Sequence, residues 1–118
     1  MIALPGGLPG ADHLRDDERI ISLLKKMADA GKYTAAICAA PKVLAKAGLL
    51  DGRKLTAYPG ALDAIQIPAG EYTGKPVEVD NRIITSRGPG TAMDFTLELI
   101  EKLAGRQKRD EVEQGLAR

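Results

Sequence analysis

Thr34-Ala35-Ala36-Ile37-Cys38-Ala39-Ala40-Pro41 is the stretch that decides the fold of this chain of 118 residues, and it contains the only cysteine. Apolar and β-prone residues lead into Cys38, and a helix-compatible run from Ala39 to Ala47 follows it and stops at Gly48. This order predicts a strand, a sharp turn and a helix. A nucleophile elbow is built in this way, with a reactive side chain on a strained turn and small residues around it.

Two interpretations of Cys38 follow from this local pattern. A helix that begins just after the sulfur directs its free N–H groups and its positive dipole end toward it, which favours the thiolate over the thiol. The alternative is a buried structural thiol, since free cysteine is among the most buried residue types. The local pattern leaves both interpretations open.

Composition excludes several classes of function. Seventeen Lys and Arg residues balance 16 Asp and Glu residues, and aromatic residues make up only 3% of the chain, so nucleic acid is not an expected partner. A single cysteine forms no internal disulfide and supplies no four-thiolate metal site, so we expect a cytoplasmic protein without metal or cofactor. No apolar run reaches the roughly 20 residues that span a bilayer, and we expect no membrane partner.

The rest of the chain is expected to alternate strands with helices. Asp80-Asn81 is a turn signal between two alternating runs and predicts a hairpin, while Thr91 and Asp94 resemble a capping box at the start of a helix. We expect strands at 1–4, 34–37, 55–58, 77–79 and 82–85. We expect helices from the acidic cluster 16–18 to Gly31, over 39–47, over 61–67, from Thr91 to Gly105 and over 107–116, with a polar loop at 68–75.

This alternation predicts a mainly parallel sheet with helices on both faces, in a single domain over residues 1–118. The active crevice of such a sheet lies beyond the carboxyl ends of its strands. Three loops should meet there: Pro5-Gly6-Gly7, the Cys38 turn and Arg87-Gly88-Pro89-Gly90. The adjacent glycines permit close backbone approach, so their N–H groups can line a pocket. This convergence favours the functional interpretation of Cys38.

The chain resembles the DJ-1/ThiJ/PfpI superfamily, and within it the bacterial DJ-1-like branch. The resemblance runs in order over nearly the whole chain and rests on four segments: Leu4-Pro5-Gly6-Gly7, 35–41, Tyr58-Pro59-Gly60 and 85–91. It implies a flavodoxin-like three-layer α/β sandwich of the class I glutamine amidotransferase type, usually assembled as a homodimer.

The resemblance also implies a function. It assigns Cys38 as the nucleophile and redox-sensitive thiol, and it implies cofactor-independent glyoxalase or deglycase chemistry on small aldehydes or glycated substrates. A thiolate adds to an aldehyde as a hemithioacetal while N–H donors stabilise the oxyanion, which is compatible with that activity. The alternatives are a non-catalytic redox-regulated chaperone or oxidative-stress sensor, or an inactive fragment. By the same resemblance the oxyanion donors are the backbone N–H groups of Gly7 and Ala39, and the pocket residues are Gly6, Tyr58, Arg87, Gly88 and Pro89.

The sequence departs from the family pattern in three places. Ala39 stands where protease-type members carry a histidine, which disfavours a peptidase, and Tyr58 stands where many members place a histidine. Members also normally have a further segment ahead of the Leu-Pro-Gly-Gly loop, with a glutamate that contacts the sulfur. We expect an N-terminally truncated domain that lacks this glutamate, for which Glu18 is no counterpart, and that associates with itself through uncovered surface. Loss of such a base slows proton transfer by roughly 10²- to 10⁴-fold.

Overall fold

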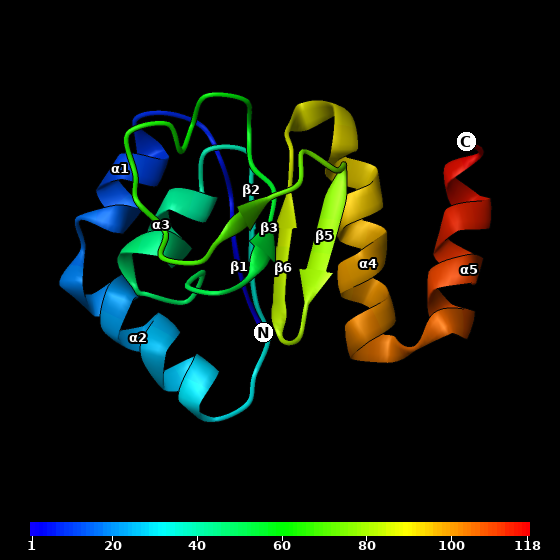
Figure 1. Ribbon diagram of the computed structural model, residues 1–118. Coiled ribbons are helices and arrows are strands. Elements are labelled where there is room, and N and C mark those ends of the chain that lie inside the picture. Colours follow the sequence, from blue (N-terminus) through cyan, green and yellow to red (C-terminus); the bar gives the residue numbers. More distant parts are fainter.

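The main sheet joins segments that lie far apart in the sequence. The computed structural model describes residues 1–118, and its main sheet has four strands in the order β1-β2-β6-β5 (Figure 1). The first three strands are parallel, and β5 runs antiparallel to β6. A mainly parallel sheet with one hairpin is therefore confirmed. The strands are β1 at Ile2–Leu4, β2 at Thr34–Ile37, β5 at Val77–Asp80 and β6 at Ile83–Ser86.

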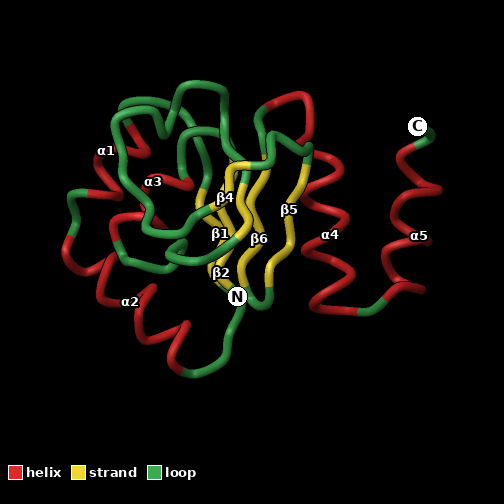
Figure 2. Tube along the Cα trace, viewed as in Figure 1, coloured by secondary structure: helices red, strands yellow, loops and turns green.

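Helices cover both faces of this sheet. Figure 1 shows α1, α2 and α3 on one side, and α4 on the other side with α5 outside it; Figure 2 shows the same layers. This arrangement is the flavodoxin-like three-layer sandwich that the sequence predicts. The helices are α1 at Gly10–Arg15, α2 at Glu18–Asp29, α3 at Pro41–Lys46, α4 at Ala92–Ala104 and α5 at Arg106–Leu116, with a 3-10 turn at Pro89–Thr91 before α4.

Alternating side chains of the central strands divide the interior into two cores. Ala36 and Ile83 belong to a cluster of 10 buried residues on the side of α2 and α3. Ala35 and Ile84, their neighbours in sequence, pack with Phe95 of α4 on the opposite face. Successive residues of a strand point to opposite faces, so a sheet covered on both sides needs small or apolar residues at every position. The apolar run before Cys38 follows from this requirement.

The connection between Leu50 and Val77 differs most from the prediction. The expected strand at 55–58 is shorter and begins earlier, as β3 at Lys54–Leu55, and it pairs in parallel with β4 at Glu71–Tyr72, inside the predicted loop. Residues 61–64 form turns and residues 65–67 have no regular structure, so the expected helix is absent. Pro68 follows the segment directly and disfavours the helical conformation of the residue before it.

Two further local predictions need correction. Helix α1 was not expected; it has only six residues and no side-chain cap, so it leaves little periodic signal. The Thr91–Asp94 capping box is absent, because the Thr91 hydroxyl instead donates to the Gly88 carbonyl at 3.0 Å and accepts from the Gly88 N–H at 3.1 Å. Asp94 pairs with Arg118.

The start of α2 is fixed by a charged cap that the acidic cluster predicts. The Asp17 carboxylate accepts a hydrogen bond from the Arg19 N–H at 2.9 Å and pairs with the Arg19 guanidinium at 2.7 Å. The side-chain hydrogen bond from Arg19, followed by the backbone one, lowers the pKa of Asp17 from 3.8 to about 2. Because this pKa is depressed, the stabilisation is complete above pH 3.8 and is lost as the pH falls toward 2.

We predict that Asp17→Ala lowers the melting temperature at pH 7 by roughly 2–6 °C, because α2 loses its cap. Asp17→Asn is the matched control and should lose less, since an asparagine side chain still accepts the N–H bond. Circular dichroism melts at pH 7 and at pH 2 measure the effect, and the difference between wild type and Asp17→Ala should shrink at the lower pH. An equal difference at both pH values contradicts this account of the cap.

Candidate functional site

Cys38 lies on the strained turn that the sequence predicts. It follows the last residue of β2, adopts a φ of 65° that non-glycine residues rarely adopt, and precedes α3 by two residues. Two backbone hydrogen bonds hold it: its N–H donates to the Ser86 carbonyl at 3.0 Å, and its carbonyl accepts from the Tyr58 N–H at 2.9 Å. Cys38 thereby joins the ends of β2 and β6 to the segment that follows β3.

The glycine loop after β1 packs directly against this turn. A Cβ atom at Gly6 would lie 2.6 Å from Cys38 Cβ and 2.9 Å from the Ile37 carbonyl oxygen, so no larger residue fits. Gly7 has a φ of 88°, in the region that favours glycine. The two adjacent glycines therefore have separate roles, one in close approach and one in turning the chain.

Cys38 opens onto a cavity of about 490 Å³. The cysteine is only half-buried, so a small molecule in the cavity can reach its sulfur. Three of the predicted site residues share the cavity with it, namely Gly7, Ala39 and Tyr58. The complete lining is Gly7, Leu8, Cys38, Ala39, Lys42, Tyr58, Pro59, Gly60 and Ala61.

Four backbone donors in this lining are unused, those of Gly7, Leu8, Ala39 and Gly60. The N–H groups of Gly7 and Ala39 donate no hydrogen bond within the chain, whereas those of Cys38 and Ala40 are both bonded. Free N–H groups beside a nucleophile are the usual means of stabilising an oxyanion. The arrangement is therefore suited to a reaction in which negative charge develops on an oxygen next to the sulfur.

The loop after β6 lies beside this cavity and not in it. We expected Arg87, Gly88 and Pro89 in the pocket of Cys38, but they line a separate hollow of about 300 Å³ together with Tyr58 and Pro59. The two spaces share Tyr58 and Pro59, and the Tyr58 ring packs on Gly88, where a Cβ would lie 3.2 Å from Tyr58 Cδ2. The Arg87 guanidinium donates to the Gly74 carbonyl at 3.1 Å. The carbonyl of Ser86, the last residue of β6, accepts the hydrogen bond of the Cys38 N–H.

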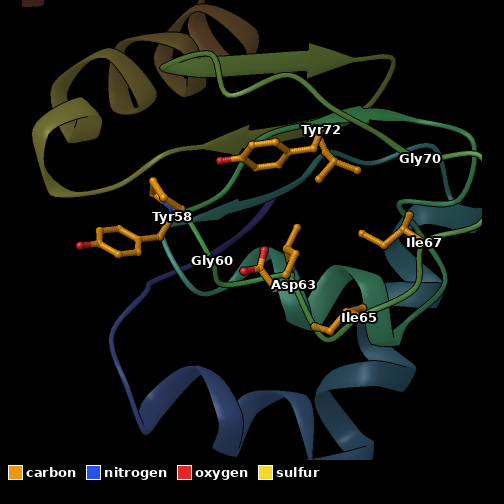
Figure 3. A pocket seen from close by; sticks show the side chains of 10 residues that line it. Tyr58, Gly60, Asp63, Ile65, Ile67, Gly70 and Tyr72 are labelled. Carbon is orange, nitrogen blue, oxygen red and sulfur yellow. The ribbon is translucent and has the colours of Figure 1, made fainter.

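A second cavity of about 460 Å³ lies on the other side of the Tyr58 segment. Figure 3 shows Tyr72 on one side of it, Asp63 and Ile65 on the other, and Tyr58 and Ile67 at its two ends. It shares Tyr58, Pro59 and Gly60 with the Cys38 cavity. The apolar residues that suggested a helix at 61–67 instead form the wall of this cavity.

Sequence reasoning missed one charged pair at the site. Lys42 lines the Cys38 cavity, and its ammonium donates to the Asp12 carboxylate of α1 at 2.8 Å. This hydrogen bond lowers the pKa of Asp12. The two residues are 30 positions apart, and each is a type that a short helix usually exposes, so no pattern in the sequence indicates the pair.

Other titratable groups lie outside this cavity. Glu18 is exposed at the start of α2 and does not line it. No group of three or more His, Cys, Asp or Glu side chains is placed to hold a metal ion. None of the helices is both long and apolar enough to pass through a membrane.

Comparisons with known proteins agree with this geometry. The family model described as "DJ-1/PfpI family" matches residues 1–102. Protein dj-1beta of Drosophila melanogaster is 42% identical over 116 residues, which are 98% of this chain and 62% of that protein. Protein DJ-1 homolog A of Arabidopsis thaliana is 42% identical over 95% of this chain and 29% of that protein. The chain thus spans less than two thirds of the length of these relatives.

Solved structures show the same fold. The crystal structure of Drosophila melanogaster DJ-1beta superposes with a TM-score of 0.89 at 42% identity, covering 98% of this chain and 62% of that one. The structure titled "Toxoplasma gondii DJ-1, oxidized" superposes with a TM-score of 0.86 at 41% identity, covering 95% of this chain and 60% of that one.

We predict that Gly6→Ala destabilises the chain by roughly 1–3 kcal/mol, since the new methyl group overlaps backbone and Cβ atoms of the Cys38 turn. Gly10→Ala is the matched control at the start of α1, just after the loop, because a Cβ there meets no atom within 4 Å. Urea denaturation followed by circular dichroism measures both variants. Equal stability of the two variants would show that Gly6 and the turn are not packed as described.

Proposed function

This chain belongs to the DJ-1/PfpI family, and we propose that it is a DJ-1-like stress-response protein, of the bacterial branch, that acts on small reactive carbonyl compounds through Cys38. One observation carries the proposal: a half-buried cysteine with positive φ lines a cavity together with the unused N–H donors of Gly7 and Ala39. A nucleophile, access for a small substrate and an oxyanion site are the minimum that carbonyl addition requires.

The first step of the proposed reaction uses only groups of this cavity. The Cys38 thiolate attacks the aldehyde carbon of methylglyoxal, a carbon–sulfur bond forms, and the π electrons of the carbonyl move onto its oxygen. The N–H groups of Gly7 and Ala39 donate to that oxyanion, which then takes a proton from water to give a hemithioacetal. In the deglycase form of the chemistry, an early adduct first dissociates into its amine or thiol and the free aldehyde, and the Cys38 thiolate then adds to that aldehyde in the same way.

The later steps require a base. A proton must leave the former aldehyde carbon and return to the neighbouring carbon, which gives a lactoyl thioester; water then cleaves the thioester to lactate and restores Cys38. The cavity lining contains no carboxyl group, and Tyr58 and Lys42 are its only side chains with a protonated oxygen or nitrogen. Without a positioned base these steps run roughly 10²- to 10⁴-fold more slowly. Addition is therefore the step that these residues support best.

We predict that Cys38→Ser lowers methylglyoxal consumption by roughly 10²-fold or more, because the hydroxyl is a far weaker nucleophile than the thiolate. Loss of methylglyoxal and appearance of lactate are followed by chromatography on the purified chain. Circular dichroism melts check that the variant is folded. Undiminished turnover by a folded Cys38→Ser variant would rule out Cys38 as the nucleophile.

A redox-regulated chaperone or stress sensor is the second candidate. Cys38 is half-buried on an open cavity, so peroxide can reach it, and one similar structure carries the word "oxidized" in its title. In the proposed oxidation the thiolate attacks one peroxide oxygen and water is released, giving a sulfenic acid; a second peroxide gives the sulfinic acid.

For this candidate we predict that peroxide adds two oxygen atoms at Cys38, located by peptide mass spectrometry, and changes the suppression of client aggregation. The Cys38→Ser variant is the control and should show suppression that peroxide does not alter. Identical responses of the two proteins would exclude regulation through this residue.

We further propose that the protein is cytoplasmic and forms a homodimer. Light scattering after size-exclusion chromatography tests the oligomeric state by measuring the molar mass.

A further inference from the structure

The Cys38 cavity contains one charged side chain among its lining residues, that of Lys42. The Lys42 side chain is only 11% exposed, which is unusual for lysine, and the Asp12 carboxylate fixes its ammonium at 2.8 Å. Lys42 lies in the first turn of α3, four residues after Cys38. A positive charge is thus held on a residue that lines the same cavity as Cys38.

The partner of Lys42 is itself tied to the site. Asp12 belongs to α1, whose Ala11 N–H donates to the Gly7 carbonyl at 2.9 Å. The same Asp12 oxygen also lies 3.4 Å from the Arg15 guanidinium, so one carboxylate is shared between two cations. Through α1, the Lys42–Asp12 pair is therefore connected to the glycine loop, which carries the unused N–H of Gly7.

Lys42 retains capacity for a second anion. An ammonium has three N–H donors, and Lys42 uses one of them, on Asp12; no other hydrogen bond of its ammonium occurs in the chain. The single negative charge of Asp12 is shared between Lys42 and Arg15, so it does not fully neutralise Lys42. A small anion in the cavity meets a positively charged donor that is already oriented.

We propose that Lys42 makes this cavity a binding site for small carbonyl compounds that carry a carboxylate next to the reactive carbon, of which glyoxylate is the simplest. The carbonyl part of this statement rests on the proposed function, whereas the preference for a carboxylate rests only on Lys42. The competing explanation is that the ion pair merely joins α1 to α3. Only the first explanation predicts that the charge of a small molecule affects how fast it reaches Cys38.

Two alkylating reagents of nearly equal size test this directly. Iodoacetate and iodoacetamide both react when the Cys38 thiolate displaces iodide, but only iodoacetate carries a carboxylate, one bond from the reactive carbon as in glyoxylate. The two rate constants are measured by intact mass spectrometry at low salt. A change in the reactivity of the thiol affects both of them equally and so drops out of their ratio. The ratio therefore measures the preference of the cavity for a carboxylate.

Four variants separate local charge from overall charge. We expect Lys42→Gln to lower the iodoacetate to iodoacetamide ratio by roughly threefold to tenfold, as removal of one nearby charge predicts. Lys42→Arg should keep the ratio, and Asp12→Asn should raise it because Lys42 loses its anion. Lys46→Gln removes the same charge from the same helix outside the cavity and should leave the ratio nearly unchanged.

Equal ratios for wild type and Lys42→Gln, or equal decreases in Lys42→Gln and Lys46→Gln, would overturn the proposal. If Lys42→Gln does not fold, Asp12→Asn decides: a ratio that fails to rise contradicts the proposal. The wild-type ratio should also fall as salt is added, because salt screens the attraction. None of these measurements needs turnover, so loss of carbonyl activity and loss of the carboxylate preference are distinguishable.

Discussion

The positive φ of Cys38 is the constraint on which the site depends. A non-glycine residue in this conformation costs on the order of 1–3 kcal/mol and persists only where its surroundings fix it. Here hydrogen bonds to Ser86 and from Tyr58 hold its backbone on both sides, and Gly6 approaches so closely that a Cβ would overlap the turn. In this conformation Cys38 lines the cavity.

The fold supplies these contacts because three parallel strands end at the same edge of the sheet. The loop after β1 brings Gly6 and Gly7, the end of β2 brings Cys38 and Ala39, and the end of β6 brings the Ser86 carbonyl. Apolar side chains fill the face of the sheet under α3. The polar groups that can contact a ligand therefore lie at the edge where the strands end. Unused N–H donors and the Lys42–Asp12 pair then give the cavity a preference for negative charge.

Sequence reasoning predicts the parts of this arrangement that depend on local chemistry. The Cys38 turn, the hairpin of β5 and β6 and the ends of α2 and α4 follow from apolar periodicity, turn residues, acidic first turns and terminal glycines. It fails where distant segments decide the outcome. Strand β4 exists because β3 lies beside it, and the Thr91 hydroxyl is taken by Gly88 before it can cap α4. The Lys42–Asp12 pair and the contact of Tyr58 with Gly88 likewise arise only when the layers pack.

The central claim is that folding of this chain places a reactive thiol in an accessible, charge-stabilising cavity. The most direct test compares the rate of Cys38 alkylation by iodoacetamide at neutral pH in the folded chain and in the same chain unfolded in urea. The account predicts faster reaction in the folded chain, since the turn holds the sulfur at the cavity and N–H donors favour negative charge beside it. Slower reaction in the folded chain would show a protected structural cysteine and contradict the account.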